Sequence, residues 1–376
     1  MTTPVAFDVT PLAGTRTGIG FSVAETMDAL GRLDAPPRLL PFAFGASVRP
    51  GVDGLPADTR VVRMPTRALL WSWARTGRPR FDRVTRGAAV LHATAFVVAP
   101  TRLPSLVTVH DCAFARSPFT ESKWVGTFDP ILRRAVARGA HVHTSTEAVA
   151  AEVEDFLGVP LRREGRLTVI AFGIPRLGDP SALPAGLRAR LAGEPYVLAM
   201  GSLVPRKNLT ALVRAFGMLE RPGVRLVLAG PDGPDRPAIE AVIASLPPAD
   251  RDRVVLAGAV ADGVRRSLLE GADVLAYPSR YEGFGFPMLE AMSLGVPVVA
   301  SDVAPLREVA GDAALLVDPD DVAGLAAALD RALSGEAERA GLIVRGRRRA
   351  GAFTWERTAR YLAALYERLA EPTISS

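Results

Sequence analysis

Short apolar runs alternate with amphipathic stretches along the first half of the chain. Runs of strand length are predicted at residues 5–9, 88–91, 105–109, 141–144 and 167–170, and helical periodicity at residues 21–32, 131–138 and 147–156. A glycine-rich turn at residues 14–20 separates the first strand from the first helix. Strands that alternate with helices predict a parallel α/β sheet in this half.

The second half repeats this pattern after a proline- and glycine-rich segment at residues 173–184, which we interpret as a linker. Strands are predicted at residues 196–200, 225–229, 254–257, 274–277, 298–300 and 314–317, and helices at residues 209–219, 237–245, 262–271, 287–293 and 321–333. Several strands are almost purely apolar, which is typical of strands buried on both faces. We predict two doubly wound α/β domains, residues 1–175 and 190–350, followed by an amphipathic helix at residues 355–370.

Composition narrows the class of protein. The chain has 376 residues, of which 48% are hydrophobic and 23% charged, as in ordinary globular proteins. The single cysteine, Cys112, allows no disulfide within the chain and favours a reducing compartment. The first eight residues lack the basic and apolar regions of a signal peptide, and the most apolar stretch, residues 87–100, is too short to cross a bilayer. We therefore expect a cytoplasmic protein.

The net charge of +5 is unevenly distributed. Eight arginines and one acid, Asp82, lie between Arg60 and Arg86, together with Trp71 and Trp73. Two interpretations stay open: a solvated arginine-rich loop, or a surface that meets an anionic membrane or a phosphorylated acceptor. The second would place the protein at the inner face of the membrane. No zinc-finger spacing or RNP-type aromatic motif accompanies the charge, so we expect no nucleic-acid partner.

The most specific motif, Glu-Gly-Phe-Gly-Phe-Pro-x-x-Glu, follows a predicted strand and runs from Glu282 to Glu290. Gly283 and Gly285 allow a ligand to approach the backbone closely, and Pro287 fits the first turn of the helix that follows. The amides of this loop and of the helix N-terminus form an anion site. The alternative interpretation is a helix start with two solvated glutamates.

A second motif, Pro-Arg-Lys-Asn-Leu at residues 205–209, follows a buried strand that ends in Gly201. Arg206 and Lys207, beside the N-terminal amides of a helix, can bind a diphosphate, the lysine as a point charge and the arginine as a fork. Exposed Arg-Lys pairs are common, so this motif alone is weak evidence for a binding site. Its position about 75 residues before Glu282 favours a functional role. We expect Lys207 to be exposed, so that Lys207→Ala weakens ligand binding with little loss of fold stability.

Together these motifs resemble those of the retaining GT-B glycosyltransferases, often called family 4 or group 1, whose E-x7-E signature matches Glu282 and Glu290. The resemblance covers essentially the whole chain and is strongest from Gly201 to Pro319. It implies two Rossmann-like domains that face each other across a cleft. Residues 1–175 would bind the acceptor, residues 190–350 would bind the nucleotide-sugar donor, and helix 355–370 would pack back on the first domain.

The resemblance also implies roles for the motif residues. Arg206, Lys207 and the amides of Gly283-Phe284-Gly285 would hold the donor diphosphate. Glu290 would accept hydrogen bonds from the ribose, and Glu282 would contact the donor sugar, with retention by front-face attack. The Pro-Arg-Lys-Asn-Leu form most resembles bacterial mannosyltransferases of polysaccharide and glycolipid synthesis. GDP-mannose is therefore the first expectation for the donor and a UDP-sugar the second, with a glycan, a lipid-linked sugar or a small molecule as acceptor.

Two further candidates lie in the first half. His110 follows an apolar strand, where a side chain points towards the ligand-binding edge of a parallel sheet, and it resembles the family's active-site histidine. Gly18, in the Thr-Gly-Ile-Gly turn, resembles the family's glycine loop and is expected to contact the donor phosphate or the acceptor. Relatives often carry two adjacent glycines where Thr17 and Gly18 stand. Structural roles are expected for the other histidines, His92, His141 and His143.

The sequence predicts no metal site and no cofactor beyond the nucleotide-sugar co-substrate. No Asp-x-Asp follows a strand as in metal-dependent transferases, and the carboxylates of Asp318, Asp320 and Asp321 open a predicted helix, where capping is expected. Activity should therefore persist in EDTA. Two alternatives stay open: a nucleotide-sugar 2-epimerase on the same fold, which acts without an acceptor, and a non-catalytic partner of another transferase.

Overall fold

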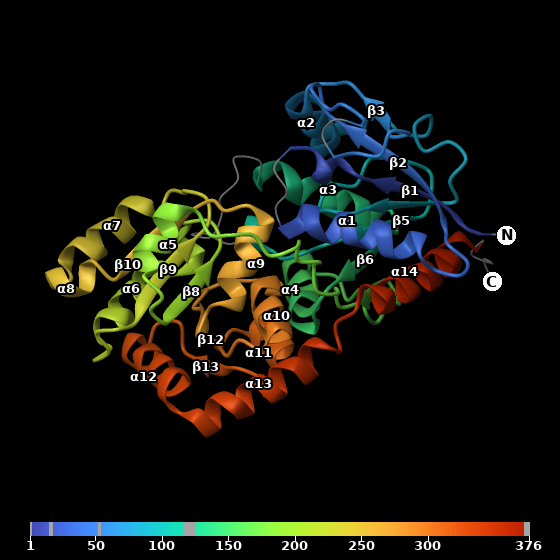
Figure 1. The fold of residues 1–376 in the computed structure, drawn as a ribbon. Coiled ribbons are helices and arrows are strands. Elements are labelled where there is room, and N and C mark those ends of the chain that lie inside the picture. Colours follow the sequence, from blue (N-terminus) through green and yellow to red (C-terminus); the bar gives the residue numbers. More distant parts are fainter. Residues whose placement is uncertain (1, 15–17, 52–53, 116–124, 372–376) are drawn as a thin grey trace. The chain divides into compact units, whose positions relative to one another are not determined.

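The computed structural model describes residues 2–14, 18–51, 54–115 and 125–371, and it divides the chain into two compact units (Figure 1). Unit 1 comprises Met1–Pro175 together with Phe353–Ser376, and unit 2 comprises Arg176–Ala352. The chain first passes from unit 1 to unit 2 between Pro175 and Arg176, inside the predicted linker. Residues 170–184 contain no helix or strand. Each unit is built on its own parallel sheet and has its own apolar core.

Unit 1 contains a parallel sheet with the strand order β3-β2-β1-β4-β5-β6-β7. The strands are β1 (Pro4–Asp8), β2 (Arg38–Phe44), β3 (Arg60–Val62), β4 (Val90–Ala93), β5 (Ser105–Thr108), β6 (His141–Thr144) and β7 (Leu167–Val169). The helices are α1 (Gly18–Gly31), α2 (Thr66–Thr76), α3 (Val125–Ala137), α4 (Glu147–Leu157) and α14 (Trp355–Ala370), with short 3-10 turns η1 (Thr10–Leu12) and η2 (Ala113–Ala115). The strand order reverses between β1 and β4, which makes their carboxyl ends the expected ligand edge.

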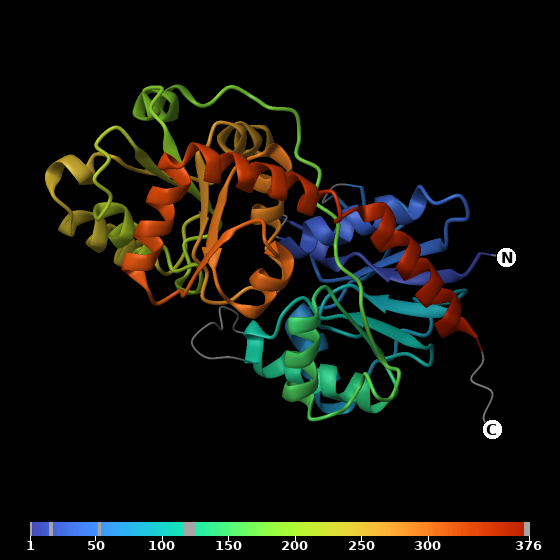
Figure 2. The ribbon, with the colours of Figure 1, turned by 90° about the horizontal axis from the view of Figure 1, so that it is seen from below.

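Helix α14 packs on unit 1 beside α1 (Figure 2), although it follows unit 2 in the sequence. Its apolar face is buried because the sequence repeats large apolar side chains at helical spacing. A directed chain of hydrogen bonds joins it to the sheet. Tyr366 OH lies 2.6 Å from Nδ1 of His92, whose Nε2 lies 2.8 Å from Thr108 Oγ1, and Thr108 lies 2.9 Å from Nδ1 of His143.

The donors and acceptors in this series of hydrogen bonds follow from the bond that His143 makes to the backbone. Nε2 of His143 lies 2.9 Å from the carbonyl oxygen of Ile170, which can only accept, so Nδ1 of His143 accepts from Thr108. Thr108 then accepts from Nε2 of His92, and Nδ1 of His92 accepts from Tyr366. Burial lowers the pKa of His143 to about 4 and that of His92 well below its usual value. Both rings are therefore neutral and structural, as the sequence analysis predicted.

Unit 2 contains a parallel sheet with the strand order β10-β9-β8-β11-β12-β13. The strands are β8 (Tyr196–Met200), β9 (Arg225–Ala229), β10 (Val254–Gly258), β11 (Val274–Tyr277), β12 (Val298–Ser301) and β13 (Leu315–Val317). The helices are α5 (Ala185–Leu191), α6 (Leu209–Gly217), α7 (Arg236–Ser245), α8 (Pro248–Arg251), α9 (Asp262–Glu270), α10 (Phe286–Leu294), α11 (Ala304–Ala310), α12 (Val322–Ser334) and α13 (Glu336–Ala350), with the 3-10 turn η3 (Pro205–Lys207). The strand order reverses between β8 and β11, the two strands that precede the sequence motifs.

The arginine-rich segment from Arg60 to Arg86 is a loop only in part, at residues 63–65 and 77–86, so the interpretation of the whole segment as a loop was wrong for the rest. It contains β3 and α2, and Trp73 on α2 is buried between Phe44 and Phe81. Trp71, on the opposite face of α2, is 57% exposed. Only one of the two tryptophans is therefore available to a partner.

Candidate functional site

The basic motif lies at the carboxyl end of β8, where a glycine makes room for the lysine. Gly201 has φ of +140°, and a Cβ built on it would lie 3.0 Å from Cε of Lys207. Pro205 opens the turn η3 and Asn208 closes it in the left-handed region, with φ of 55°. The aliphatic stem of Lys207 therefore runs back over the end of its own strand.

The basic turn is tied to the loop that follows β11. The amide of Arg280 donates to the carbonyl oxygen of Arg206 at 2.8 Å, and Nε of Arg280 donates to Oδ1 of Asn208 at 3.2 Å. Because β8 and β11 are neighbours in the sheet, both loops leave the same edge at adjacent positions. These bonds hold the two motifs in one cluster.

Lys207, Arg206, Glu282 and Tyr277 form the charged centre of that cluster. Nζ of Lys207 lies 2.5 Å from Oε1 of Glu282 and 2.9 Å from the hydroxyl of Tyr277, and Nη1 of Arg206 lies 3.2 Å from Oε2 of Glu282. Lys207 and Glu282 are each only 8% exposed. Burial raises the pKa of Glu282, but the charges of Lys207 and Arg206 outweigh it and lower that pKa to about 2.

This geometry corrects the expectation that Lys207 is an exposed cation. Its burial and its contact with Glu282 make it part of the fold of unit 2 as well as a candidate ligand group. A buried carboxylate that loses its cation is strongly destabilising. Lys207→Ala should therefore lower the stability of unit 2, contrary to the prediction from sequence.

The glycine loop between β11 and α10 is as tight as its sequence indicates. Gly285 has φ of 97° and caps α10, with Pro287 in the first turn, and a Cβ on Gly285 would lie 2.8 Å from a methyl group of Leu306. Phe284 is 5% exposed and packs edge-on against Phe286, with ring centroids 5.2 Å apart. The loop thus presents the positive end of the α10 dipole beside the charged cluster.

Glu290 lies within α10 and pairs with a different cation. Its side chain is fully buried, and Oε2 accepts a hydrogen bond from Nη2 of Arg265 on α9. Oε1 is also buried and has no hydrogen-bond partner among the residues that the structure describes. Burial raises the pKa of Glu290 above its usual value, although Arg265 opposes the shift. The two glutamates of E-x7-E therefore lie in separate ion pairs.

His110 follows β5 at the carboxyl edge of the sheet in unit 1. Nε2 lies 2.8 Å from the carbonyl oxygen of Thr94, and the ring stacks on Phe172 with centroids 5.5 Å apart. Burial lowers the pKa of His110 to about 4. The ring is therefore neutral near pH 7, with its proton on Nε2 and an acceptor lone pair on Nδ1. Gly18 is the exposed first residue of α1, and Thr17 lies outside the described residues.

Asp8, which sequence reasoning missed, lies beside His110 at the same edge of the sheet. It ends β1 and is 3% exposed, and its carboxylate accepts from the amide of Thr10 at 2.8 Å. Thr94 Oγ1 donates to the carbonyl oxygen of Asp8 at 2.7 Å, so Asp8, Thr94 and His110 form one connected row. Burial raises the pKa of Asp8 to about 6. The available signal was its place as the last residue of the first buried strand.

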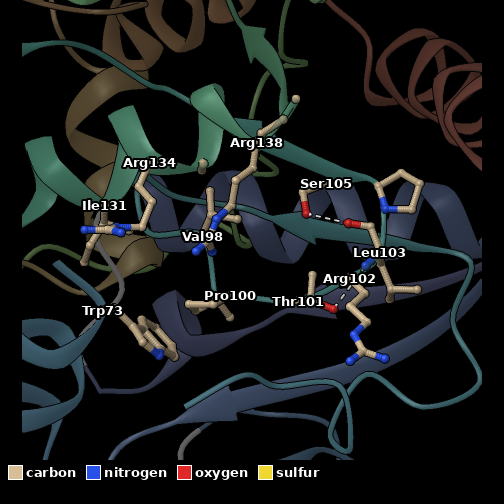
Figure 3. A pocket seen from close by; sticks show the side chains of 15 residues that line it. Trp73, Val98, Pro100, Thr101, Arg102, Leu103, Ser105, Ile131, Arg134 and Arg138 are labelled. Atoms are coloured by element: carbon tan, nitrogen blue, oxygen red, sulfur yellow. Dashed lines mark hydrogen bonds between the residues drawn. The ribbon is translucent and has the colours of Figure 1, made fainter. Parts of the chain in front are cut away.

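A cavity of about 110 Å³ in unit 1 contains none of the predicted site residues (Figure 3). It lies by the start of β5, at the edge opposite to His110, and is lined by Arg134 of α3 and by Arg138, which follows α3. Arg134 donates to the carbonyl oxygens of Ala74 and Arg75 at the end of α2. Arg134 thus has a structural role at a helix C-terminus.

Among the described residues, no group of three or more His, Cys, Asp or Glu side chains is arranged to hold a metal ion. Asp321 caps α12 by accepting from the amide of Gly324 at 2.8 Å, as its sequence position predicted. The same part of the chain contains no helix that is long and apolar enough to cross a membrane.

Comparison with known proteins identifies the family. Residues 188–349 match the model of the family "Glycosyl transferases group 1". The chain is 32% identical over 274 residues to O-antigen chain mannosyltransferase B of Escherichia coli, covering 71% of each protein. It is 31% identical over 242 residues to alpha-D-kanosaminyltransferase of Streptomyces kanamyceticus, covering 61% of each. The chain belongs to the group 1 glycosyltransferases. The predicted group 1 family and the prediction of a glycosyltransferase are confirmed.

Solved structures support the fold of this glycosyltransferase over nearly its whole length. Sucrose-phosphate synthase of Thermosynechococcus elongatus superposes with a TM-score of 0.72 at 24% identity, covering 98% of this chain and 99% of that one. The HepE protein of Anabaena in complex with UDP superposes with a TM-score of 0.70 at 19% identity, covering 98% and 100%. The predicted GT-B fold of two Rossmann-like units is confirmed.

Proposed function

We propose that this glycosyltransferase transfers a hexose from a nucleotide-diphosphate donor that binds in unit 2. The observation that carries the proposal is the cluster of Arg206, Lys207 and Glu282 at the reversal of strand order, beside the N-terminus of α10. Ligands of doubly wound sheets bind at this edge, and helix N-termini with cations bind phosphate. The relatives named as mannosyltransferases favour GDP-mannose as donor, with a UDP-sugar second.

The proposed mechanism retains the configuration of the sugar. The anomeric bond to the diphosphate breaks, the acceptor oxygen bonds to the same face of the anomeric carbon, and the acceptor proton moves to the leaving diphosphate. Arg206, Lys207 and the amides of residues 283–285 stabilise the charge that develops on the diphosphate, so that no metal is required. Glu282 lies against both cations and faces the donor sugar. Neutral His110 offers Nδ1 as a hydrogen-bond acceptor at the ligand edge of unit 1.

The ion pair between Lys207 and Glu282 has a consequence for donor binding. Lys207 is held by Glu282 at 2.5 Å, so an incoming diphosphate must compete with an internal carboxylate for the same cation. Glu282 is then partly released towards the sugar as the diphosphate takes over Lys207. This exchange couples the two halves of the donor, the phosphate and the hexose, at one pair of side chains.

We propose an acceptor of the glycan, lipid-linked or small-molecule class in unit 1, at the edge that carries His110 and Gly18. The proposal extends to an anionic membrane surface, through Trp71 and the arginines of the segment from Arg60 to Arg86. Trp71 lies under the guanidinium of Arg75, 4.2 Å from the ring centroid. Flotation with phosphatidylglycerol vesicles tests this contact: wild type should float, and Trp71→Ala should float less. Equal flotation with neutral vesicles would contradict it.

The function is tested by incubating the protein with GDP-mannose, UDP-glucose and UDP-galactose, with and without acceptor glycans, in the presence of EDTA. We expect nucleoside diphosphate to be released only when an acceptor is present, and NMR of the product to show the donor's anomeric configuration. Conversion of a nucleotide sugar without acceptor would instead support an epimerase. A strict requirement for Mn²⁺ would contradict the electrostatic assignment.

A further inference from the structure

Glu290 has two carboxylate oxygens with different surroundings. Oε2 is held by Arg265, whereas Oε1 is buried and lacks a hydrogen-bond partner among the described residues. A buried charged oxygen without a donor is costly and therefore rare in folded proteins. Such an oxygen is expected where a ligand supplies the missing donor. Both oxygens belong to one planar carboxylate group, so the residue that holds Oε2 also sets the direction of Oε1.

We propose that Arg265 is a positioning residue for donor binding: by holding Oε2 of Glu290, it directs Oε1 towards the ribose hydroxyls of a nucleoside diphosphate. The inference rests on the proposed function, which places the donor nucleotide in unit 2. Arg265 comes from α9 and Glu290 from α10, two helices that pack against each other. The pair therefore holds the carboxylate from outside its own helix.

Arg265 also favours the ionised form of this carboxylate, in which both oxygens accept hydrogen bonds. Burial raises the pKa of Glu290, Arg265 lowers it, and Asp262 on α9 raises it further. Without Arg265, only the two raising effects are left, and the protonated acid becomes dominant closer to neutral pH. The other elements that contact α10 also carry ionisable groups. They include Tyr277 on β11, Arg347 on α13, which lies against Gly295, and Arg307 on α11, which pairs with Asp302.

The neighbouring residue offers a matched control. Arg266 follows Arg265 on α9 but pairs with Glu270 of the same helix at 2.8 Å, away from Glu290. Both substitutions to alanine remove one arginine from the same helix and change the net charge equally. Arg266→Ala therefore shows the effect of losing an arginine from α9 while the contact with Glu290 is kept.

The experiment measures dissociation constants of GDP and of 2′,3′-dideoxy-GDP by calorimetry between pH 6 and pH 8.5, with UDP and its dideoxy form as a second pair. Wild type should bind the ribonucleotide more tightly than the dideoxynucleotide at every pH. Arg265→Ala should weaken ribonucleotide binding about 10-fold at pH 7, which is within the coupling range of contacting residues. Its preference for the ribonucleotide should shrink and recover as the pH rises.

Two further variants separate positioning from a general loss of structure. Arg265→Lys retains a cation and should restore a flat pH profile, with a smaller loss of affinity. Glu290→Gln should abolish both the ribose preference and its dependence on pH, whichever residue occupies position 265. Arg266→Ala should behave as wild type.

Each outcome is decisive. If Arg265→Ala retains the wild-type ribose preference and a flat pH profile, Arg265 does not position Glu290 and the inference is overturned. If Arg265→Ala fails to fold, a ribose preference in Arg265→Lys that is smaller than in wild type at every pH supports the inference, and one equal to wild type throughout contradicts it. If wild type binds neither GDP nor UDP, the proposed function itself fails.

Discussion

Replacing Lys207 by methionine should destabilise unit 2, because the buried carboxylate of Glu282 then lacks its nearest cation. The substitution keeps the length of the side chain but removes the cation that lies 2.5 Å from Oε1 of Glu282. Glu282 is then left buried with Arg206 as its neighbouring cation, at 3.2 Å. Replacing Glu282 by glutamine as well removes the uncompensated charge, so the double variant should regain most of the lost stability.

The magnitude follows from the pKa of Glu282. Lys207 and Arg206 lower it from 4.5 to about 2 against the effect of burial, and 2.5 units correspond to about 3 kcal/mol. Because the folded pKa is depressed, this stability is present above pH 4.5 and is lost as the pH falls towards 2. At pH 7, Lys207→Met should therefore cost about 2–3 kcal/mol, and the double variant should lie within about 1 kcal/mol of wild type.

The distribution of tryptophan makes the assay specific for each unit. All four tryptophans, at positions 71, 73, 124 and 355, fall in the sequence ranges of unit 1. Denaturation with urea can thus be monitored by tryptophan fluorescence for unit 1, and by hydrogen exchange of peptides from β8 and β11 for unit 2. Lys207→Met should shift only the second transition. The control Arg236→Met, which removes an exposed pair with Asp232 and Glu240, should shift neither.

The result that would refute this reasoning is simple additivity. If Lys207→Met and Glu282→Gln each destabilise unit 2 and the double variant shows the sum of both losses, the two side chains are not coupled. Lys207→Met with wild-type stability would equally show that Lys207 does not compensate Glu282.

Three further predictions concern unit 1. Burial raises the pKa of Asp8 to about 6, so Asp8→Asn should increase the stability of unit 1 above pH 6 by at most about 3 kcal/mol. This gain should vanish below pH 3.8. Equal gains in urea denaturation at pH 7.5 and at pH 3.5 would contradict the prediction. Burial lowers the pKa of His110, His141 and His143 to about 4, so unit 1 should lose stability as the pH falls from 6.5 to 4. The urea midpoint of unit 1, measured by tryptophan fluorescence, should therefore fall at a higher pH than the midpoint of unit 2, measured by hydrogen exchange. Tyr366→Phe leaves Nδ1 of His92 without its donor and should cost about 1–3 kcal/mol in thermal or urea denaturation, and an unchanged midpoint would rule out that bond.

The strands of unit 2 were predictable because their sequences are nearly pure apolar runs. β8, β9 and β11 have the predicted bounds, since each run ends at a glycine or proline. β2 was missed because Pro41 interrupts its pattern, and β3 and α2 because arginines hide their apolar residues. α13 was missed because it contains two glycines and many arginines, and its contacts with α10 supply what its own sequence lacks.

The site was predictable only as far as the motifs reach. Their chemistry and their positions after two strands could be derived from sequence, and the neighbouring placement of β8 and β11 brings Lys207 to Glu282. The burial of that pair depends on the route of the lysine over Gly201, which no spacing encodes. The contact of Arg265 with Glu290 joins two helices whose relative rotation is set by packing. Asp8 was missed because one carboxylate at a strand end forms no motif.

Binding of nucleoside diphosphates tests most directly that unit 2 carries the donor site at this cluster. Calorimetry with GDP and UDP, in EDTA, should compare wild type with the double variant Lys207→Met/Glu282→Gln, whose stability should be close to that of wild type. The account predicts that wild type binds at least one of the two nucleotides without metal, and that the double variant binds it at least about 10-fold more weakly. Equal affinity in the two proteins would contradict the account, because the diphosphate would then bind elsewhere.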